Sequence, residues 1–384
     1  MHATGTSRWF RLNLWLHRWT SLVATVPFLI LCLTGTILIF HHEIDEALGV
    51  VPSVESFDAA AAQPLAKAVD NVLAKFPDER VLSVGIDPKE HPGVLLLVTA
   101  PNTATGFDGA RLRFAHLATA ELTDEASLDA DKTFTGFLLD LHARWFLGPL
   151  GELIGALIAL LVLVSLLSGL VVYAPYVKRI AFGVLRRGRG ARLLQLDLHN
   201  FVGTLVLGWA LVVTVTGFLL GFGTIAQFVW QQTELSELKR QYAGVPVDAR
   251  RPPIDVDRVH AATSAALPAG WHVVSMIFPG TDFSTERHYS VLVGGEGLDE
   301  RLFRVALVDA DSGAVSTVVQ LPWYLKAIFV AQPLHFGDYG GLALKLLWTA
   351  CTWLTLFITA NGAWLWWDRR RKRRRGGAAK GASA

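Results

Sequence analysis

Four long apolar segments constrain the fold of this chain more than any other feature of its sequence. A helix needs about 20 apolar residues to cross the roughly 30 Å hydrocarbon core of a bilayer. The four segments run over about residues 15–40, 150–173, 201–228 and 342–367. Only 18% of the residues are charged, below the roughly one quarter of a soluble domain. We therefore expect a membrane protein with four spanning helices.

The first apolar segment resembles a signal peptide in its position but not in its length or its ending. It is too long for the apolar region of a signal peptide, and His41, His42 and Glu43 follow it instead of the small residues of a cleavage site. We therefore expect this segment to stay in the protein as the first span.

The charges beside the spans predict their orientation, because Lys and Arg concentrate on the cytoplasmic side. Cations precede the first span, fill the loop between the second and third spans, and follow the fourth: Arg8, Arg11, Lys178, Arg179, Arg186, Arg187, Arg189, Arg192 and Arg369–Arg375. The other two connections are long and rich in Asp and Glu. We expect a bacterial inner-membrane protein with both termini in the cytoplasm. Topology explains the basic tail, and we predict no nucleic-acid partner.

The spacing of polar landmarks indicates an internal duplication. His17 and Gly35 are 18 residues apart, and so are His199 and Gly217. His142 and Gly169 are 27 residues apart, as are His335 and Gly362. Each glycine follows a small or polar residue, namely Thr34, Thr216, Ser168 and Asn361. The chain therefore reads as two copies of a span, a periplasmic part and a second span.

Each periplasmic part has the pattern of a small α+β module. In the first, residues 66–75 have helical spacing and strand-like runs follow at 81–86 and 94–99. In the second, residues 256–266 have helical spacing and strand-like runs follow at 272–278, 288–293 and 302–308. The expected fold class is a membrane α-helical protein with two periplasmic α+β modules, internally duplicated.

This pattern divides the chain into eight parts. They are an N-terminus with the first span, a periplasmic module, the second span, a basic loop, the third span, a second periplasmic module, the fourth span and a basic tail. In that order they cover residues 1–43, 44–137, 138–176, 177–196, 197–228, 229–333, 334–367 and 368–384.

Four histidines lie at two matched depths of the predicted bundle. His17 and His199 lie at the cytoplasmic ends of the first and third spans, and His142 and His335 at the periplasmic starts of the second and fourth. Polar groups at such depths are costly and mark functional sites. Two equivalent imidazoles on different helices are the axial ligands of a six-coordinate haem iron. We predict two haems, one between His17 and His199 near the cytoplasmic face and one between His142 and His335 near the periplasmic face.

Glycines and arginines near the histidines allow two readings each. Gly35, Gly169, Gly217 and Gly362 fall at the levels of the two predicted haems and leave room for a porphyrin face. Alternatively, they permit close helix packing. Arg18 and Arg144 sit next to histidines and suit haem propionates, or else they follow from topology and snorkelling at the interface.

Other histidines and aromatic residues have weaker assignments. His41 and His42, at the periplasmic end of the first span, are candidates to replace one ligand of the outer haem or to contact substrate. The remaining periplasmic histidines read as surface or core residues: His91, His116, His260, His272 and His288. Four aromatic residues near the periplasmic face line a docking surface or form an interfacial belt: Trp145, Trp323, Tyr324 and Tyr339.

Several classes of protein are excluded by what the sequence lacks. Cys32 and Cys351 both lie in apolar segments, which argues against disulfides, a zinc site or an iron–sulfur cluster. No cytoplasmic segment is long enough for a flavin or nicotinamide domain, and no nucleophile elbow, HExxH motif or P-loop occurs. The electron donor is therefore expected to be a separate molecule, either a membrane quinol or a cytoplasmic reductant.

The motifs around these histidines resemble the PepSY-associated transmembrane proteins. The resemblance rests on WLHRWTSLVATVPFLILCLTGTILIFHHEID from Trp15, LDLHARWFLGPLGE from Leu139, LDLHNFVG from Leu196 and PLHFGDYGG from Pro333. Within that family the chain is most similar to the FoxB-type ferric-siderophore reductases. The resemblance implies two b-type haems, span histidines at His17, His142, His199 and His335, PepSY-like periplasmic modules, and reduction of siderophore-bound Fe(III) in the periplasm for iron uptake.

Three functions remain open at this point. The first is a dihaem reductase. The second is a regulatory protein whose periplasmic modules bind a partner while the spans only anchor them, as PepSY domains elsewhere inhibit peptidases. The third is a siderophore permease. Broken helices with polar sites at mid-membrane are expected for a transporter. Pro27 interrupts the first span, but no charged residue lies at mid-membrane.

Overall fold

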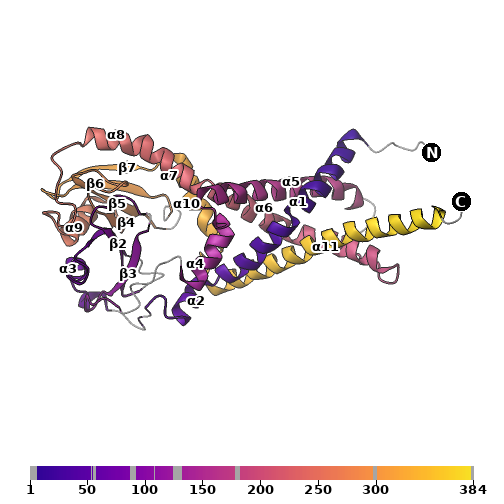
Figure 1. The fold of residues 1–384 in the computed structure, drawn as a ribbon, viewed down its shortest axis with the longest axis horizontal. Helices are drawn as coiled ribbons and strands as arrows, with labels where there is room; N and C mark the ends of the chain where they lie inside the picture. Colours follow the sequence, from indigo (N-terminus) through magenta and orange to yellow (C-terminus); the bar gives the residue numbers. More distant parts are fainter. Residues whose placement is uncertain are drawn as a thin grey trace. The chain divides into compact units, whose positions relative to one another are not determined.

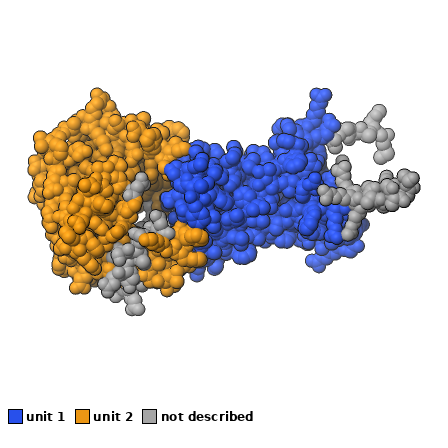
Figure 2. Space-filling view, viewed as in Figure 1, with its two compact units in different colours: residues 1–40, 138–222, 331–384 blue, residues 41–137, 223–330 orange. Residues whose placement is uncertain are grey.

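The computed structural model describes residues 7–52, 54, 58–86, 92–107, 109–123, 132–177, 182–296 and 301–381 (Figure 1). His91, Lys178 and Arg179 lie outside these residues. The chain forms two compact units (Figure 2). The helical unit comprises residues 1–40, 138–222 and 331–384, and the sheet unit comprises residues 41–137 and 223–330.

The helical unit contains four helices that are long and apolar enough to cross a membrane. They are α1 (Arg8–Leu38), α5 (Pro149–Val177), α6 (Ala191–Leu220) and α11 (Gly341–Gly381). The first of them begins after Ser7, whose hydroxyl accepts a hydrogen bond from the Phe10 amide. The third predicted span was expected to reach residue 228. Instead α6 ends at Leu220 before Gly221, and a separate helix α7 (Gly223–Gln232) follows.

The four long helices form a closed ring in which each contacts two neighbours. Helix α1 packs against α5 and α11, and α6 packs against the same two helices. Figure 1 shows them running side by side. Helices α1 and α6 therefore lie across one diagonal of the bundle, and α5 and α11 lie across the other. A side chain on one helix must reach through the bundle interior to meet its diagonal counterpart.

Short helices connect the long ones to the sheet unit or belong to it. Two of them lead into spans: α4 (Phe134–Leu139), which continues into a π-helical turn η3 (Asp140–Arg144) before α5, and α10 (Trp323–Phe336) before α11. The others are α2 (His41–Ala47), the 3-10 turn η1 (Ala59–Ala61), α3 (Leu65–Lys75), α8 (Glu234–Gln241) and α9 (Val256–Ala266).

The sheet unit holds one antiparallel sheet of seven strands. The strands are β1 (Glu79–Ile86), β2 (Val94–Pro101), β3 (Arg111–His116), β4 (His272–Ile277), β5 (His288–Gly294), β6 (Arg304–Asp309) and β7 (Val315–Gln320). Their order is β3-β2-β1-β4-β5-β6-β7. The first three come from one repeat and the last four from the other. The sequence predicted two modules, and the structure joins their strands into a single sheet.

The junction between the repeats is the pairing of β1 with β4. Ser83 lies opposite Ile277, Val84 opposite Met276 and Gly85 opposite Ser275. Helices α3 and α9 contact each other and cover one face of the joined sheet. Val72, Val84, Met276 and Val291 are fully buried there. Burying this shared apolar layer is favourable, because each fully buried aliphatic side chain contributes about 1.5–3 kcal/mol.

A buried ion pair closes the first half of the sheet. The guanidinium of Arg113 is 1% exposed, donates to both carboxylate oxygens of Glu79, and lies 3.4 Å from the ring centroid of Phe76. Burial raises the pKa of Glu79, but hydrogen bonds with Thr99 and Arg113 and the arginine charges outweigh it, so that the pKa is lowered. The carboxylate therefore stays charged and holds the buried guanidinium.

We expect Arg113→Met to destabilise β1–β3 by about 3–5 kcal/mol, because it leaves the Glu79 charge without its buried partner. Arg111 also pairs with Glu79, at 3.3 Å, but its side chain is 52% exposed. Arg111→Met is the matched control and should cost less than about 1 kcal/mol. Hydrogen exchange of peptides from these strands measures both. Equal losses in the two variants would contradict this view of the ion pair.

Candidate functional site

The helical unit brings four histidine side chains together as two pairs. The His17 ring on α1 and the His199 ring on α6 have centroids 6.3 Å apart, with planes at 71°. The His142 ring in η3 and the His335 ring near the end of α10 also have centroids 6.3 Å apart, with planes at 65°. These are the pairs that the duplication grouped. His17 and His199 come from diagonally placed helices, so that their rings meet in the bundle interior.

Hydrogen bonds fix the tautomer of three of these histidines. The Nδ1 atom of His17 lies 2.8 Å from the Ser165 carbonyl oxygen, and that of His335 lies 2.9 Å from the Val213 carbonyl oxygen. A carbonyl oxygen only accepts, so each Nδ1 carries the proton and donates it. The neutral ring then has a bare lone pair at Nε2. This arrangement is typical of metal-ligating histidines, whose other ring nitrogen is held by a second hydrogen bond.

His142 follows the same rule through a hydroxyl group. Its Nδ1 lies 2.8 Å from Thr34 Oγ1, and this hydroxyl donates its own proton to the Ile30 carbonyl. Thr34 Oγ1 is therefore the acceptor, and Nδ1 of His142 is the donor. His199 differs from the other three. The Ile358 backbone lies near its ring, but its buried Nδ1 has no partner with hydrogen-bond geometry among the described residues.

Each imidazole lies against one of the four glycines. A Cβ atom at Gly169 would lie 2.9 Å from Cε1 of His17, and one at Gly217 would lie 2.8 Å from Cε1 of His335. The corresponding distances are 3.1 Å from Gly35 to His142 and 3.3 Å from Gly362 to His199. The sequence allowed two readings of these glycines, room for a porphyrin face or close helix packing. In the structure each of them lies against the edge of an imidazole ring.

The acceptor carbonyls explain why glycine is needed at these positions. Ser165 and Val213 lie four residues before Gly169 and Gly217, which is one helical turn. A side chain on the glycine would cover the path of the incoming imidazole to that carbonyl. Ser168 and Thr216, just before the glycines, turn their hydroxyls back to carbonyls of their own helix. A small or polar residue followed by glycine thus leaves a patch of helix backbone uncovered, and the imidazole ring packs against this patch.

An unusual backbone segment positions His142. The π-helical turn η3 is followed by Trp145 and Phe146, both with positive φ, at 53° and 58°. Such strained residues cluster at functional sites, and π-turns do so as well. Helix α5 then starts so close to this turn that a Cβ atom at Gly151 would lie 1.4 Å from the Arg144 carbonyl oxygen. The close approach holds His142 in its place.

The pair geometry fits haem iron. A bond between imidazole and a metal ion is about 2.0–2.1 Å long. With ring bonds of about 1.33 Å, a ring nitrogen lies about 1.1 Å from the ring centroid. Two imidazoles that bind one metal ion from opposite sides through Nε2 then have centroids roughly 6.3 Å apart. Both pairs show 6.3 Å.

The ligand set also fits haem better than a bare metal ion. In the described part of the chain, no three His, Cys, Asp or Glu side chains are grouped to hold a metal ion. Each pair therefore offers two imidazoles alone. Structural zinc needs four protein ligands, whereas haem supplies its own equatorial nitrogens and requires two axial ones.

The other predicted site residues have different surroundings. Arg18 is exposed, and its guanidinium lies 5.6 Å from the Trp19 ring centroid. Arg144 lies 3.8 Å from Asp140 and 3.5 Å from Glu152, so acidic side chains of its own unit surround it. His41 and His42 belong to the sheet unit, where they start α2 and their ring centroids lie 3.9 Å apart.

The four aromatic candidates do not form one group. Trp323 is 79% exposed, and Tyr324 donates a hydrogen bond to Glu234; both belong to the sheet unit. Tyr339 and Trp145 belong to the helical unit. The first is exposed and packs edge-on against Trp348, and the indole nitrogen of the second is buried.

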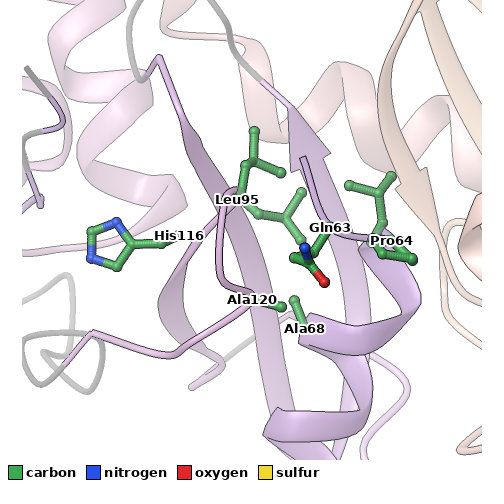
Figure 3. Close-up of a pocket in the computed structure, with 8 residues that line it drawn as sticks. Gln63, Pro64, Ala68, Leu95, His116 and Ala120 are labelled. Atoms are coloured by element: carbon green, nitrogen blue, oxygen red, sulfur yellow. The ribbon is translucent and has the colours of Figure 1, made fainter. Parts of the chain in front are cut away.

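The sheet unit offers no comparable site in its described part. A small depression beside the start of α3 is lined by Gln63, Pro64, Leu65, Ala68, Leu95, His116, Leu117 and Ala120. Figure 3 shows the His116 ring pointing away from the other labelled side chains. His288 is buried, with Nδ1 near Thr285 and Nε2 near Ser316, which agrees with a structural role.

Sequence reasoning located the histidines and glycines but missed the carbonyl acceptors. A backbone carbonyl has no sequence signature of its own. Its only signal here is its position, one helical turn before a glycine of the repeat. The small or polar residue before each glycine was the available signal, since Thr34 accepts from His142 directly.

We expect Gly217→Val to abolish haem binding at the His142–His335 pair, because the new side chain would displace the His335 ring. Gly208 lies on the same helix and a Cβ atom there would meet nothing within 4 Å, so Gly208→Val is the control. Haem per chain, measured from the absorption spectrum of purified protein, should fall only in Gly217→Val. Full haem content in that variant would contradict the role of the glycine.

Comparison with known proteins agrees with the architecture. An uncharacterized protein of Pseudomonas aeruginosa, PA4219, is 28% identical over 264 residues, which cover 60% of this chain. The aligned region covers 63% of that relative, so the chain spans less than two thirds of its length. The family described as PepSY-associated TM region matches residues 14–369. Because this match covers nearly the whole chain, the protein belongs to the PepSY-associated transmembrane family.

Proposed function

We propose that this protein is a dihaem oxidoreductase of the bacterial inner membrane that reduces Fe(III) held by a siderophore in the periplasm. The observation that carries the proposal is the geometry of the two histidine pairs. Both have the ring separation of axial ligands, and His17, His142 and His335 direct an unprotonated Nε2 away from their Nδ1 hydrogen bonds.

Two sites at different depths suit electron transfer across the membrane. His17 lies 18 residues before Gly35 on α1, and Gly35 contacts the His142 ring. At 1.5 Å per residue, this separation is about 27 Å along the helix, close to the roughly 30 Å of the hydrocarbon core. Bound haem supplies reversible one-electron chemistry at each pair. The protein's own helices set the distance and keep water away.

The histidines and their acceptors set the properties of the iron sites. A donated Nδ1 proton makes an imidazole a stronger ligand and fixes its orientation. Axial ligation, hydrogen bonding and burial together set the reduction potential.

The substrate class follows from the chemistry of iron chelates. Fe(III) is a hard cation that oxygen-rich chelators hold tightly, and reduction to Fe(II) lowers its charge and weakens that binding. One electron is therefore enough to release the metal for uptake. The donor is a membrane quinol or a cytoplasmic reductant that meets the basic cytoplasmic side. The family resemblance to siderophore reductases supports this choice of acceptor.

We expect His17→Ala and His199→Ala each to remove one haem, and His142→Ala and His335→Ala each to remove the other. Loss of one axial ligand leaves an incomplete site in a bundle that excludes water. Reduced-minus-oxidised spectra and haem per chain measure this effect. His260→Ala, on α9 of the sheet unit, is the control and should retain both haems. Loss of haem in the control, or retention in all four variants, would contradict the assigned pairs.

The proposed activity is measured with protein in lipid vesicles that contain a reductant. An Fe(III)-siderophore and a coloured Fe(II) chelator are added outside. We expect coloured product with the unmodified protein and none with His199→Ala, because the electron path is then broken. Protein that carries both haems, and whose haems the internal reductant reduces, should make Fe(II) outside. If it does not, the substrate assignment is wrong, and the haems pass their electrons to another acceptor.

A further inference from the structure

Two tryptophans occupy repeat-related places beside the histidine pairs. Gly155 and Trp348 correspond in the duplication, since each precedes the ring-contacting glycine of its helix, Gly169 or Gly362, by fourteen residues. In the first repeat, the indole of Trp145 lies against Gly155, with Nε1 3.7 Å from a Cβ built there. In the second, the helix itself supplies the indole at Trp348. Each repeat therefore places an indole at this position, from different chain segments.

The partner surface of the second indole is again a glycine. A Cβ atom at Gly337 would lie 2.5 Å from Cγ of Trp348, and Gly337 has a φ of 72°. We call His142–His335 the outer pair and His17–His199 the inner pair. Gly337 comes two residues after His335, so Trp348 packs against the turn that carries a histidine of the outer pair. Trp145 likewise comes three residues after His142. Both indoles are thus tied to the segments that present the periplasmic-side histidines.

The depth and direction of these positions place them between the two pairs. Fourteen residues span about 21 Å, nearly four helical turns, so that Trp348 lies on the same face of α11 as Gly362, which contacts His199. By the same spacing, Gly155 lies on the same face of α5 as Gly169, which contacts His17. Trp348 therefore stands on the inward face of α11, and Trp145, in the turn before α5, lies against the inward face of that helix at Gly155. Both positions are above the inner pair, His17–His199, and about one turn below the level of the outer pair, His142–His335.

Packing alone does not account for tryptophan here. The Nε1 atoms of Trp145 and Trp348 are buried and have no hydrogen-bond partner among the described residues. An unpaired buried donor costs about 1–3 kcal/mol, and an aliphatic side chain would fill such space without that cost. Because each nitrogen is covered by protein, neither N–H is presented to a bound group. The feature left to explain the choice is the large aromatic ring.

We propose that the indole rings of Trp145 and Trp348 provide the electronic coupling between the inner and outer histidine pairs. This inference rests on the proposed function. A quinol gives up two electrons and two protons when it becomes quinone, so it reduces two Fe(III) ions in succession, whereas a one-electron cytoplasmic reductant reduces one. Each electron crosses the layer that holds the indoles and ends on Fe(III), which becomes Fe(II). The indoles are neither oxidised nor reduced overall. The ring of Trp209, on α6, packs edge-on against the ring of Trp348, with centroids 6.4 Å apart.

The test compares leucine and phenylalanine at both positions in the haem-loaded full chain. The double variant Trp145→Leu/Trp348→Leu removes the rings, and Trp145→Phe/Trp348→Phe keeps an aromatic ring without the N–H. Trp353→Leu is the control, because this residue is on α11 but 52% exposed toward the surface of the unit. Haem content and equilibrium potentials are measured first. The rate at which the outer haem is reduced after rapid mixing with quinol is then followed by absorbance.

We expect the leucine double variant to keep two haems with unchanged potentials but to pass the electron severalfold more slowly. The phenylalanine double variant should recover most of the rate, and Trp353→Leu should match the unmodified protein. An unchanged rate in the leucine variant would overturn the coupling role while leaving the dihaem function intact. If its potentials or haem content shift and phenylalanine does not restore the rate, the indoles are packing elements and the inference is wrong. Absence of haem from the unmodified protein would instead refute the proposed function.

Discussion

The hydrogen bond from an imidazole Nδ1 to the bare backbone of a neighbouring helix is the interaction on which the helical unit depends. His17 makes it to Ser165 and His335 makes it to Val213. Each bond needs a glycine one turn further along, since a side chain there would collide with the ring. The bond orients the ring, sets its tautomer and ties two helices together within an apolar bundle. A polar group at this depth is tolerated because it is paired.

The duplication repeats this interaction, so that the chain holds two histidine pairs. Each repeat contributes one histidine to each pair, so neither pair can form from one repeat alone. The same rule holds in the sheet unit, where β1 and β4 join the two halves edge to edge. Fusion of the repeats therefore assembles both units at once: the histidines meet in the bundle, and the strands share one core beneath α3 and α9.

Sequence patterns predicted the local elements well and the long-range pairing less well. The four spans, both module helices and five of the seven strands follow from hydrophobic periodicity. Strand β3 was missed because its Arg113 is buried, and only the fold reveals its partner Glu79. The single sheet was missed because pairing between β1 and β4 is not encoded in either strand alone. The end of α6 was predicted too late, at residue 228 instead of Leu220, because the apolar run continues past Gly221.

The same contrast between local patterns and long-range contacts holds for the candidate site. The duplication grouped the histidines by depth, and the structure places those rings side by side. The repeat spacing singled out the four glycines, and the structure places each of them against the edge of an imidazole ring. Distances between rings and the carbonyl acceptors depend on how helices cross, which no spacing in one chain specifies. Arg144 illustrates the limit, because its acidic neighbours are four residues away at Asp140 and, across the turn into α5, at Glu152, and the sequence did not predict either contact.

The absorption spectrum of the purified protein tests the central claim most directly. The account predicts two b-type haems per chain, both low-spin and six-coordinate in the oxidised and dithionite-reduced states, because each iron would have two imidazole ligands. Protein that stays colourless after expression with ample haem would contradict the account, since the facing histidine pairs would then have another purpose.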